Sequence, residues 1–187
     1  MVNDILDMSK IEAGKFDIVK EPFDAGVLVK SCCDVMRHAA EQKSIALQTD
    51  IAPNLPELAA DKRACKQILL NVISNAIKFT GEGGFVLVSA HIDNGNVAFV
   101  VADNGIGIAE EDLPRLGTPF VQAHVSYDRN HDGAGLGLSV VKGLVRLHGG
   151  RLELASVLGE GTTATILLPL DADESAEPLP PRAMSAA

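Results

Sequence analysis

Two glycine clusters constrain this chain more than any other feature of its sequence. The first, Asp103-Asn104-Gly105-Ile106-Gly107-Ile108, follows an apolar run, and the second, Gly133-Ala134-Gly135-Leu136-Gly137-Leu138, opens a predicted helix. Glycine suits backbone that turns tightly or lies close to a ligand. The leading Asp can accept a hydrogen bond from a base amine, and free amides at a helix N-terminus can bind phosphate. Together the clusters suggest a purine-nucleotide site, although either one alone would also suit a surface turn.

Composition argues against several other classes of protein. The 187 residues carry a formal net charge of −9, whereas nucleic-acid binding needs clustered Lys and Arg. No apolar run approaches the ~20 residues that a transmembrane helix needs. The cysteines Cys32, Cys33 and Cys65 lack metal-type spacing and are expected to be reduced core residues.

Hydrophobic periodicity predicts an α+β fold. Helices are expected at 1–14, 24–43, 62–80 and 136–147, and strands at 16–19, 45–51, 85–92, 97–102, 151–156 and 162–168. Asp24 and Asp61 are the predicted N-caps of the second and third helices, and Val35 is expected on the buried stripe of the second. This order predicts a two-layer α/β sandwich, a mixed, mostly antiparallel sheet covered on one face by three helices. The acidic, Pro- and Ala-rich segment 171–187 is expected to be disordered.

The helix at 62–80 has a polar face that could bind nucleotide. Asn71, Asn75 and Lys78 are spaced i, i+4 and i+7, so they share one face of the helix. Two amide oxygens can ligate Mg²⁺, and a Lys one turn further on can contact phosphates. Phe79 could pack against an adenine ring, and Ile106 or Ile108 could form the floor of the base pocket. An Asn pair on a helix would also suit a solvated surface.

The segment before the second glycine cluster is a long polar loop. It runs from Ala123 to Asp132, contains Arg129 and is rich in charged and His residues. Loops of this length are usually functional or disordered. We expect a lid over the phosphates. The Gly-x-Gly-x-Gly spacing of the cluster matches neither a dinucleotide fingerprint nor a Walker loop.

The ordered motifs resemble those of bacterial sensor histidine kinases over roughly residues 2–170. The matching segments are Asn71–Thr80 (the N box), Asp103–Gly107 (G1), Pro119-Phe120 (F), Gly133–Leu138 (G2) and Gly159–Thr163 (G3). Residues 3–14 resemble the end of the family's second dimerisation helix, and 116–122 are similar to the alphaproteobacterial cell-fate kinases of the PleC/DivJ kind. The resemblance implies a Bergerat-type (GHKL) ATP-binding domain at 15–170, preceded by the helix end at 1–14 and followed by the tail at 171–187.

The same resemblance implies a role for each site residue. Asn71 and Asn75 serve Mg²⁺ and phosphate, Lys78 contacts phosphate, and Asn71 and Lys78 act in catalysis. Asp103 reads adenine, with support from Thr163 on the neighbouring strand. Other expected contacts to ATP come from Phe79, Gly105, Ile106, Gly107, Phe120, Arg129, Gly133, Gly135, Leu136, Gly137 and Leu138.

The implied activity is transfer of the ATP γ-phosphoryl group to a His on a dimerisation helix, for relay to a response-regulator Asp. The implied partners are ATP, the protein's own dimerisation domain in a homodimer, and a receiver domain. None of the five His residues fits the acceptor motif, namely His38, His91, His124, His131 and His148. We therefore expect the acceptor to lie outside this chain. The domain is expected to face the cytoplasm, in a parent protein that can be anchored in the inner membrane.

Three alternatives share the fold. A GHKL ATPase would need a Glu as water-activating base where this chain has Asn71, and an amide cannot take up a proton at neutral pH. An anti-sigma-factor serine kinase is disfavoured by the Ser9–Gly14 lead-in. A nucleotide-binding sensor or pseudokinase that performs no phosphotransfer remains the main alternative, although the complete set of motifs argues against it.

Overall fold

The computed structural model describes residues 2–119 and 135–170 of the chain. Its helices are α1 (Val2–Glu12), α2 (Ala25–Gln42), α3 (Lys62–Phe79), the short 3₁₀ helix η1 (Leu113–Arg115) and α4 (Gly137–Leu147). Its strands are β1 (Glu21–Phe23), β2 (Ala46–Ile51), β3 (Leu58–Ala60), β4 (Phe85–Asp93), β5 (Asn96–Asp103), β6 (Arg151–Val157) and β7 (Gly161–Pro169). The predicted boundaries of α2, α3, α4 and the five strands β2, β4, β5, β6 and β7 agree with these to within one or two residues, whereas β1 and β3 were not predicted.

Five strands form the main sheet, in the order β2-β4-β5-β7-β6. The β2–β4 pair is parallel, and the other three pairs are antiparallel. A parallel pair needs a crossover connection, and here α3 supplies it between β2 and β4. Strands β1 and β3 form a separate two-stranded antiparallel ribbon.

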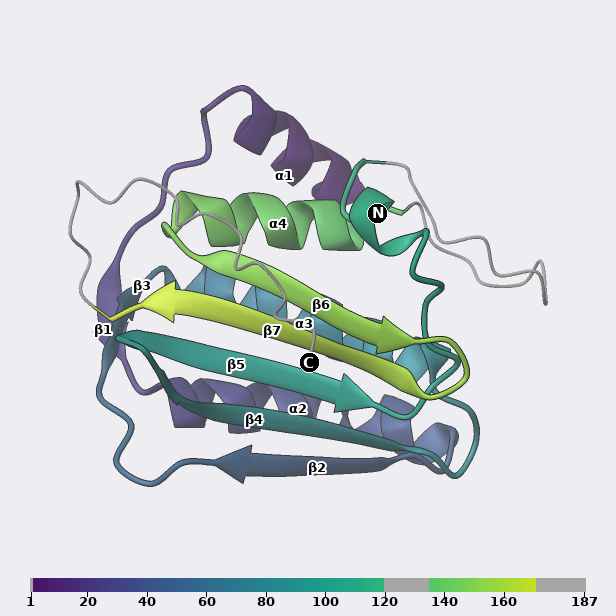
Figure 1. Ribbon diagram of the computed structural model, residues 1–187. Coiled ribbons are helices and arrows are strands. Elements are labelled where there is room, and N and C mark those ends of the chain that lie inside the picture. Colours follow the sequence, from purple (N-terminus) through teal and green to yellow (C-terminus); the bar gives the residue numbers. More distant parts are fainter. Residues whose placement is uncertain (1, 120–134, 171–187) are drawn as a thin grey trace.

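The helices α2, α3 and α4 pack on one face of the main sheet; in Figure 1, α2 and α3 lie behind the strands and α4 lies above β6. Their apolar stripes pack on alternate residues of the strands, such as Val97, Phe99 and Val101 of β5, which are buried. Burial of apolar surface is the main term that stabilises such a layer arrangement. The predicted two-layer sandwich with a mostly antiparallel sheet is confirmed.

Two local predictions were wrong. Val35 is 57% exposed, because the buried face of α2 is formed instead by residues such as Val29, Cys32 and Cys33. Residues 16–19 form no strand. The Val19 N–H donates to the Asp61 side chain at 3.2 Å, and strand pairing begins only at β1.

Helix α1 packs against α4, on the side of α4 away from the sheet (Figure 1). Gly143 of α4 makes room for it, since a Cβ at this position would lie 2.8 Å from Cγ2 of Ile11. Gln67 of α3 donates a hydrogen bond of 2.8 Å to Asp7. Ile5 and Leu6 remain about half exposed, so only part of the apolar face expected for this helix is buried.

Candidate nucleotide-binding site

The polar face of α3 points toward the start of α4. The opposite face of α3 is buried in the core through Ile68, Leu69, Val72, Ile73, Ala76 and Ile77. This burial fixes the rotation of the helix and leaves Asn71, Asn75 and Lys78 half-buried. The Asn71 Nδ2 donates to the Gly137 carbonyl over 3.4 Å, so the N box and the second glycine cluster lie side by side. The structure therefore brings these two predicted parts of the site together.

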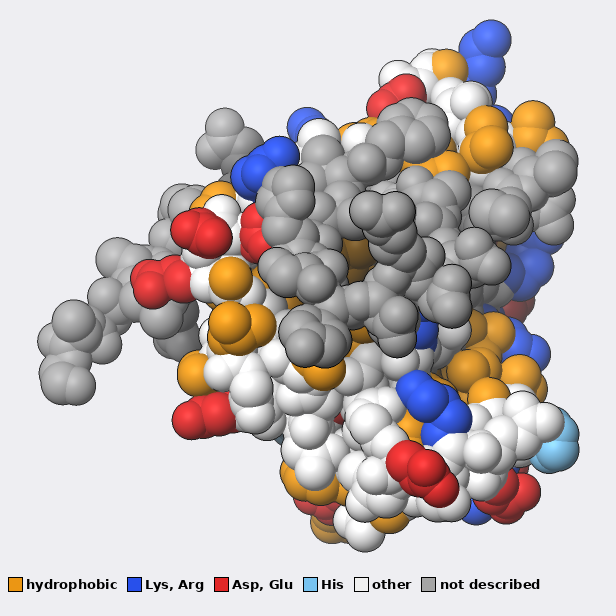
Figure 2. All heavy atoms as spheres, turned by 90° about the vertical axis from the view of Figure 1, so that its right-hand side faces the viewer, with side chains coloured by type: hydrophobic (Ala, Val, Ile, Leu, Met, Phe, Trp, Pro, Cys, Tyr) orange, Lys and Arg blue, Asp and Glu red, His pale blue; other side chains and the backbone are white. Residues whose placement is uncertain are grey.

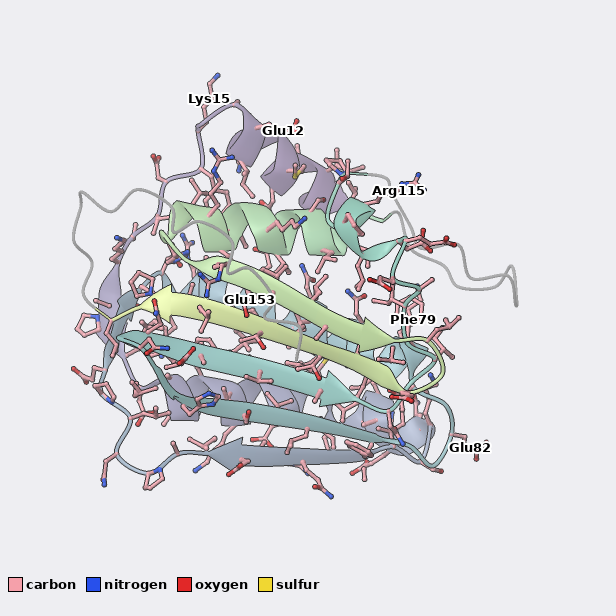
Figure 3. The ribbon with its side chains drawn as sticks, viewed as in Figure 1. Glu12, Lys15, Phe79, Glu82, Arg115 and Glu153 are labelled. Atoms are coloured by element: carbon pink, nitrogen blue, oxygen red, sulfur yellow. The ribbon has the colours of Figure 1, made fainter. Side chains whose placement is uncertain are left out.

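The end of α3 places an aromatic ring beside a cation. The Lys78 Nζ lies 5.1 Å from the centre of the Phe79 ring, a distance typical of a cation–π contact. In Figure 3 the labelled Phe79 lies at the end of the molecule where β5 ends, between Arg115 and Glu82. The Phe79 carbonyl accepts a hydrogen bond of 3.2 Å from the Ile106 N–H. The end of α3 is thus joined directly to the first glycine cluster.

Asp103 stands at the end of β5 and is held by two backbone donors. Its Oδ1 accepts hydrogen bonds from the Gly105 N–H at 2.8 Å and the Thr162 N–H at 3.3 Å. Burial raises the pKa of the Asp103 carboxyl above its usual value, and the two N–H groups oppose that shift. Both of these donors reach the same oxygen, which leaves Oδ2 as the atom best placed to face a ligand. A half-buried carboxylate held in this way is suited to a selective hydrogen bond.

The glycines of the first cluster are required by close backbone contacts. A Cβ at Gly105 would lie 2.5 Å from the Phe79 carbonyl oxygen. Gly107 has a φ of +66°, and a Cβ there would overlap the Val157 carbonyl. Ile106, between them, is 40% exposed and free to contact a ligand. The cluster is therefore a tightly packed turn that presents one apolar side chain.

The second cluster leads into α4 without a side-chain cap. Gly135 has a φ of +69°, Leu136 is the N-cap residue, and among the residues that the structure describes no side chain caps the first turn. The amides of such a turn, together with the helix dipole, favour an anion. Leu136 is buried and Leu138 packs against the core, so their side chains anchor the helix start. The predicted site residues Phe120, Arg129 and Gly133 lie outside the described residues.

One prediction about the site was wrong by a single residue. Asp103 is paired with Thr162, not Thr163, which stands opposite Ala102 and Ala155. Successive side chains of a strand point to opposite faces, so Thr163 lies on the uncovered face of the sheet, away from Asp103. Support for the carboxylate comes from the backbone of Thr162.

Sequence reasoning also missed Lys43. Its Nζ donates three hydrogen bonds of 2.8–2.9 Å to the carbonyls of Ile77, Lys78 and Thr80. A cation at a helix C-terminus is favoured by the helix dipole, and here it satisfies the last carbonyls of α3. Lys43 lies at the C-cap of α2, and no local pattern connects it with a helix end 34 residues or more away.

His148 has a structural role, as the sequence predicted. It is 4% exposed, its Nε2 accepts from the Asp61 N–H at 3.1 Å, and its Nδ1 is 2.7 Å from the Leu144 carbonyl. The two contacts require a neutral ring with the proton on Nδ1. Burial lowers the pKa of His148, and the Leu144 carbonyl and Asp61 oppose that shift. The ring joins the end of α4 to the N-cap of α3.

The cysteines are also structural. Cys32, Cys33 and Cys65 are free and buried. Burial raises the pKa of Cys32 and Cys33 to about 11 and of Cys65 to about 12, so all three stay as thiols at neutral pH. This agrees with the expectation of reduced core residues.

Charge alone does not mark the site. Figure 2 looks onto the end of the molecule where β5 ends, and on the described part of this face Lys, Arg, Asp and Glu side chains are interspersed. Among the described residues, no group of three or more His, Cys, Asp or Glu could hold a metal ion. The helices of residues 2–119 and 135–170 are all too short or too polar to span a lipid bilayer.

The fold is that of the Bergerat-type ATP-binding domains, and comparison with known proteins agrees. A family model described as histidine kinase-, DNA gyrase B- and HSP90-like ATPase matches residues 60–172. The chain belongs to this family, and the proteins to which it is similar include histidine kinases.

Three comparisons illustrate these similarities. An uncharacterised sensor-like histidine kinase of Rhizobium meliloti is 45% identical over 177 residues, 95% of this chain and 34% of the relative. The histidine protein kinase DivJ of Caulobacter vibrioides is 45% identical over 183 residues, 97% of this chain and 30% of DivJ. The crystal structure of full-length ShkA in complex with AMPPNP superposes with a TM-score of 0.81 at 36% identity, covering 95% of this chain and 36% of ShkA. The chain thus spans about a third of each of these proteins, and the predicted likeness to kinases of the PleC/DivJ kind is confirmed.

Proposed function

We propose that this chain binds ATP with Mg²⁺ and, within its full-length protein, transfers the γ-phosphoryl group to a histidine on a dimerisation helix. The observation that carries the proposal is the Asp103 carboxylate, held through Oδ1 by Gly105 and Thr162 beside the end of α3. Membership of a family of ATPases and the likeness to an AMPPNP-bound kinase support ATP as the nucleotide.

Adenine recognition is assigned to Asp103, Phe79 and Ile106. The Oδ2 atom of Asp103 would accept a hydrogen bond from the exocyclic amine of adenine. A base with a carbonyl at that position would leave the carboxylate without a donor, which is how a buried acceptor discriminates. Phe79 and Ile106 would contact the ring, and Gly105 and Gly107 allow the turn that carries Ile106.

Phosphate binding is assigned to Lys78 and the start of α4. The uncapped amides around Gly135 and Gly137 would face the phosphates, with Leu136 and Leu138 anchoring the turn. Lys78 would add a positive charge from α3. We extend this assignment to Gly133, to Phe120 as a hinge of the lid and to Arg129 within it, on the resemblance alone.

Mg²⁺ is assigned to Asn71 and Asn75. The Asn71 Nδ2 donates to the Gly137 carbonyl, so its Oδ1 remains as a hard oxygen donor of the kind that Mg²⁺ prefers. When bound, the ion would neutralise charge that develops on the phosphates. The residues of this chain would position the nucleotide so that its γ-phosphorus faces the acceptor.

In the proposed reaction, the γ-phosphoryl group moves from ATP to the imidazole ring of the acceptor His. The bond from the γ-phosphorus to the β–γ bridging oxygen breaks, a bond to an imidazole nitrogen of the acceptor His forms, and ADP leaves. The phosphoryl group then passes to an Asp carboxylate of a response-regulator receiver domain. We infer that residues 1–14 form the end of the second dimerisation helix of a homodimer. Residues 15–170 would form the catalytic domain, and residues 171–187 a tail. The catalytic domain would face the cytoplasm.

Calorimetric titration with AMPPNP, with and without Mg²⁺, tests nucleotide binding. We expect Asp103→Asn to weaken binding about tenfold or more, since an Asn oxygen lacks the charge that strengthens the hydrogen bond. Asn75→Ala should reduce the benefit of adding Mg²⁺. Unchanged affinity in Asp103→Asn would remove Asp103 from the adenine site.

Incubation with γ-labelled ATP tests the transfer. The chain alone should acquire no acid-labile label, whereas a separately produced dimerisation helix that carries an acceptor His should be labelled when both are mixed. Acid-labile label on this chain alone would contradict the proposed location of the acceptor. Robust ATP hydrolysis that Asn75→Ala abolishes would instead indicate an ATPase.

A further inference from the structure

The helix-covered face of the sheet ends in one polar row. On this face, the residues paired across β5, β7 and β6 form apolar rows. One such row consists of Phe99, Ile166 and Leu152. The last row toward the nucleotide site is Asp103, Thr162 and Ser156, three polar residues in register. A polar row at the end of an apolar face needs internal partners, because burial without hydrogen bonds is unfavourable.

The hydroxyl of Ser156 uses all of its hydrogen-bonding capacity. It donates to the Gly161 carbonyl at 2.7 Å, accepts from the Ile108 N–H at 2.8 Å and lies 2.9 Å from the Thr162 hydroxyl. A hydroxyl has one hydrogen and two acceptor sites. Since its hydrogen goes to Gly161, the Thr162 hydroxyl must be the donor to Ser156.

The three residues that Ser156 contacts, Ile108, Gly161 and Thr162, belong to the two segments that hold Asp103, namely the turn after β5 and the start of β7. Ile108 follows the turn whose Gly105 N–H holds the Asp103 Oδ1, and Thr162 supplies the second N–H to the same oxygen. Gly161 packs so closely against the Asp103 carbonyl that no Cβ would fit. The Thr162 bond, at 3.3 Å, is already long for an N–H donor, so a shift of a few tenths of an ångström would break it.

We propose that Ser156 is a positioning residue that sets the selectivity of the site for adenine. It acts through Ile108, Gly161 and Thr162, which fix the orientation of the Asp103 carboxylate, and does not itself contact the nucleotide. The proposal rests on the proposed function, because it assumes that Asp103 reads the base.

The test compares the affinities of ATP and inosine triphosphate, which differ in the amine that Asp103 would recognise. In Ser156→Ala we expect ATP to bind more weakly and inosine triphosphate to be little affected. The ratio of the dissociation constant for inosine triphosphate to that for ATP should fall roughly tenfold. This is the scale of one lost or misaligned hydrogen bond. A residue with a merely structural role would weaken both nucleotides alike and leave the ratio unchanged.

Three further variants complete the experiment. Ser156→Thr keeps the hydroxyl and should restore the ratio. Ser89→Ala, a matched control on the uncovered face of the sheet, should leave both affinities unchanged. In an Asp103→Asn background, Ser156→Ala should no longer alter the ratio. If Ser156→Ala does not fold, as judged by circular dichroism, Ser156→Cys replaces it with a side chain of similar size and weaker hydrogen bonding.

The outcomes separate this inference from the proposed function. If Asp103→Asn lowers the ratio of the dissociation constants and Ser156→Ala leaves it unchanged, the role of Ser156 is overturned. Adenine recognition by Asp103 then remains intact. If Asp103→Asn does not change this ratio, both the role of Ser156 and adenine recognition by Asp103 are overturned.

Discussion

Lys43 offers a sharp test of how α3 is held at the nucleotide site. The substitution Lys43→Met keeps the apolar stem of the side chain and removes all three hydrogen bonds to the carbonyls of Ile77, Lys78 and Thr80. Each bond contributes about 0.5–1.5 kcal/mol net to stability, and more where a charge is involved. Because these part-buried carbonyls can recover some hydration, we expect a total loss of about 2–3 kcal/mol in the free energy of unfolding.

Urea and thermal unfolding, followed by circular dichroism, measure this loss. For a domain of this size it corresponds to a fall of roughly 5–10 °C in Tm. Lys30→Met is the matched control, since Lys30 is exposed on the same helix α2, and it should stay within about 0.5 kcal/mol of the unmodified chain. Lys43→Arg should be intermediate, because a planar guanidinium cannot direct three donors to carbonyls grouped around one point.

The same variant should weaken nucleotide binding. Lys78 and Phe79 lie in the last turn of α3, and the Phe79 carbonyl holds the Ile106 N–H of the first glycine cluster. Loosening this turn should therefore displace both the Lys78 and Phe79 side chains and the first glycine cluster. The reasoning would be refuted if Lys43→Met lost no more stability than Lys30→Met in the urea measurement.

Other predictions concern groups further from the helix end. Asp103→Asn should leave the free energy of unfolding unchanged or higher at pH 7, because burial raises the pKa of Asp103 and folding therefore disfavours its charged form; a clear loss in urea unfolding would contradict this. Stability should fall as pH drops below about 6.5, because the lowered pKa of His148 leaves the unfolded chain binding more protons; His148→Gln should show a smaller decline between pH 7.5 and 5.0, and an equal decline would exclude His148 as the cause. Gly143→Ala should speed hydrogen exchange of the α1 amides because its Cβ would lie 2.8 Å from Cγ2 of Ile11, and Ile11→Ala in the same chain should slow it again; unchanged exchange in the single variant would argue against this packing.

The sequence predicts those parts of the fold that depend on local pattern. The stripe along α3 and the alternation in β4 and β5 repeat often enough to fix both the type of element and its buried face. The three-residue strands β1 and β3 are too short to show a period, and only their pairing with each other makes them strands.

The candidate site follows the same division. Asp103, Asn71 and the glycine clusters could be identified because their motifs are contiguous in sequence. The register that places Thr162 opposite Asp103 is set by tertiary pairing, and an error of one residue moves a side chain to the other face. Ser156 did leave a signal, since it is the polar residue that follows Leu152 and Leu154 on the same face of β6. Lys43 left none.

The hydrogen bond from Thr162 to Asp103 also affects the order in which the chain can become functional. It joins residues 59 apart in the sequence, so the carboxylate gains its second support only after β7 has paired with β5. Long-range strand pairing closes a large loop and forms late relative to local helices. A growing or refolding chain would therefore contain α3 and the β4–β5 hairpin well before its base pocket was complete. Nucleotide binding should then report on the fully assembled sheet, and a saturating ligand would stabilise the whole domain by mass action.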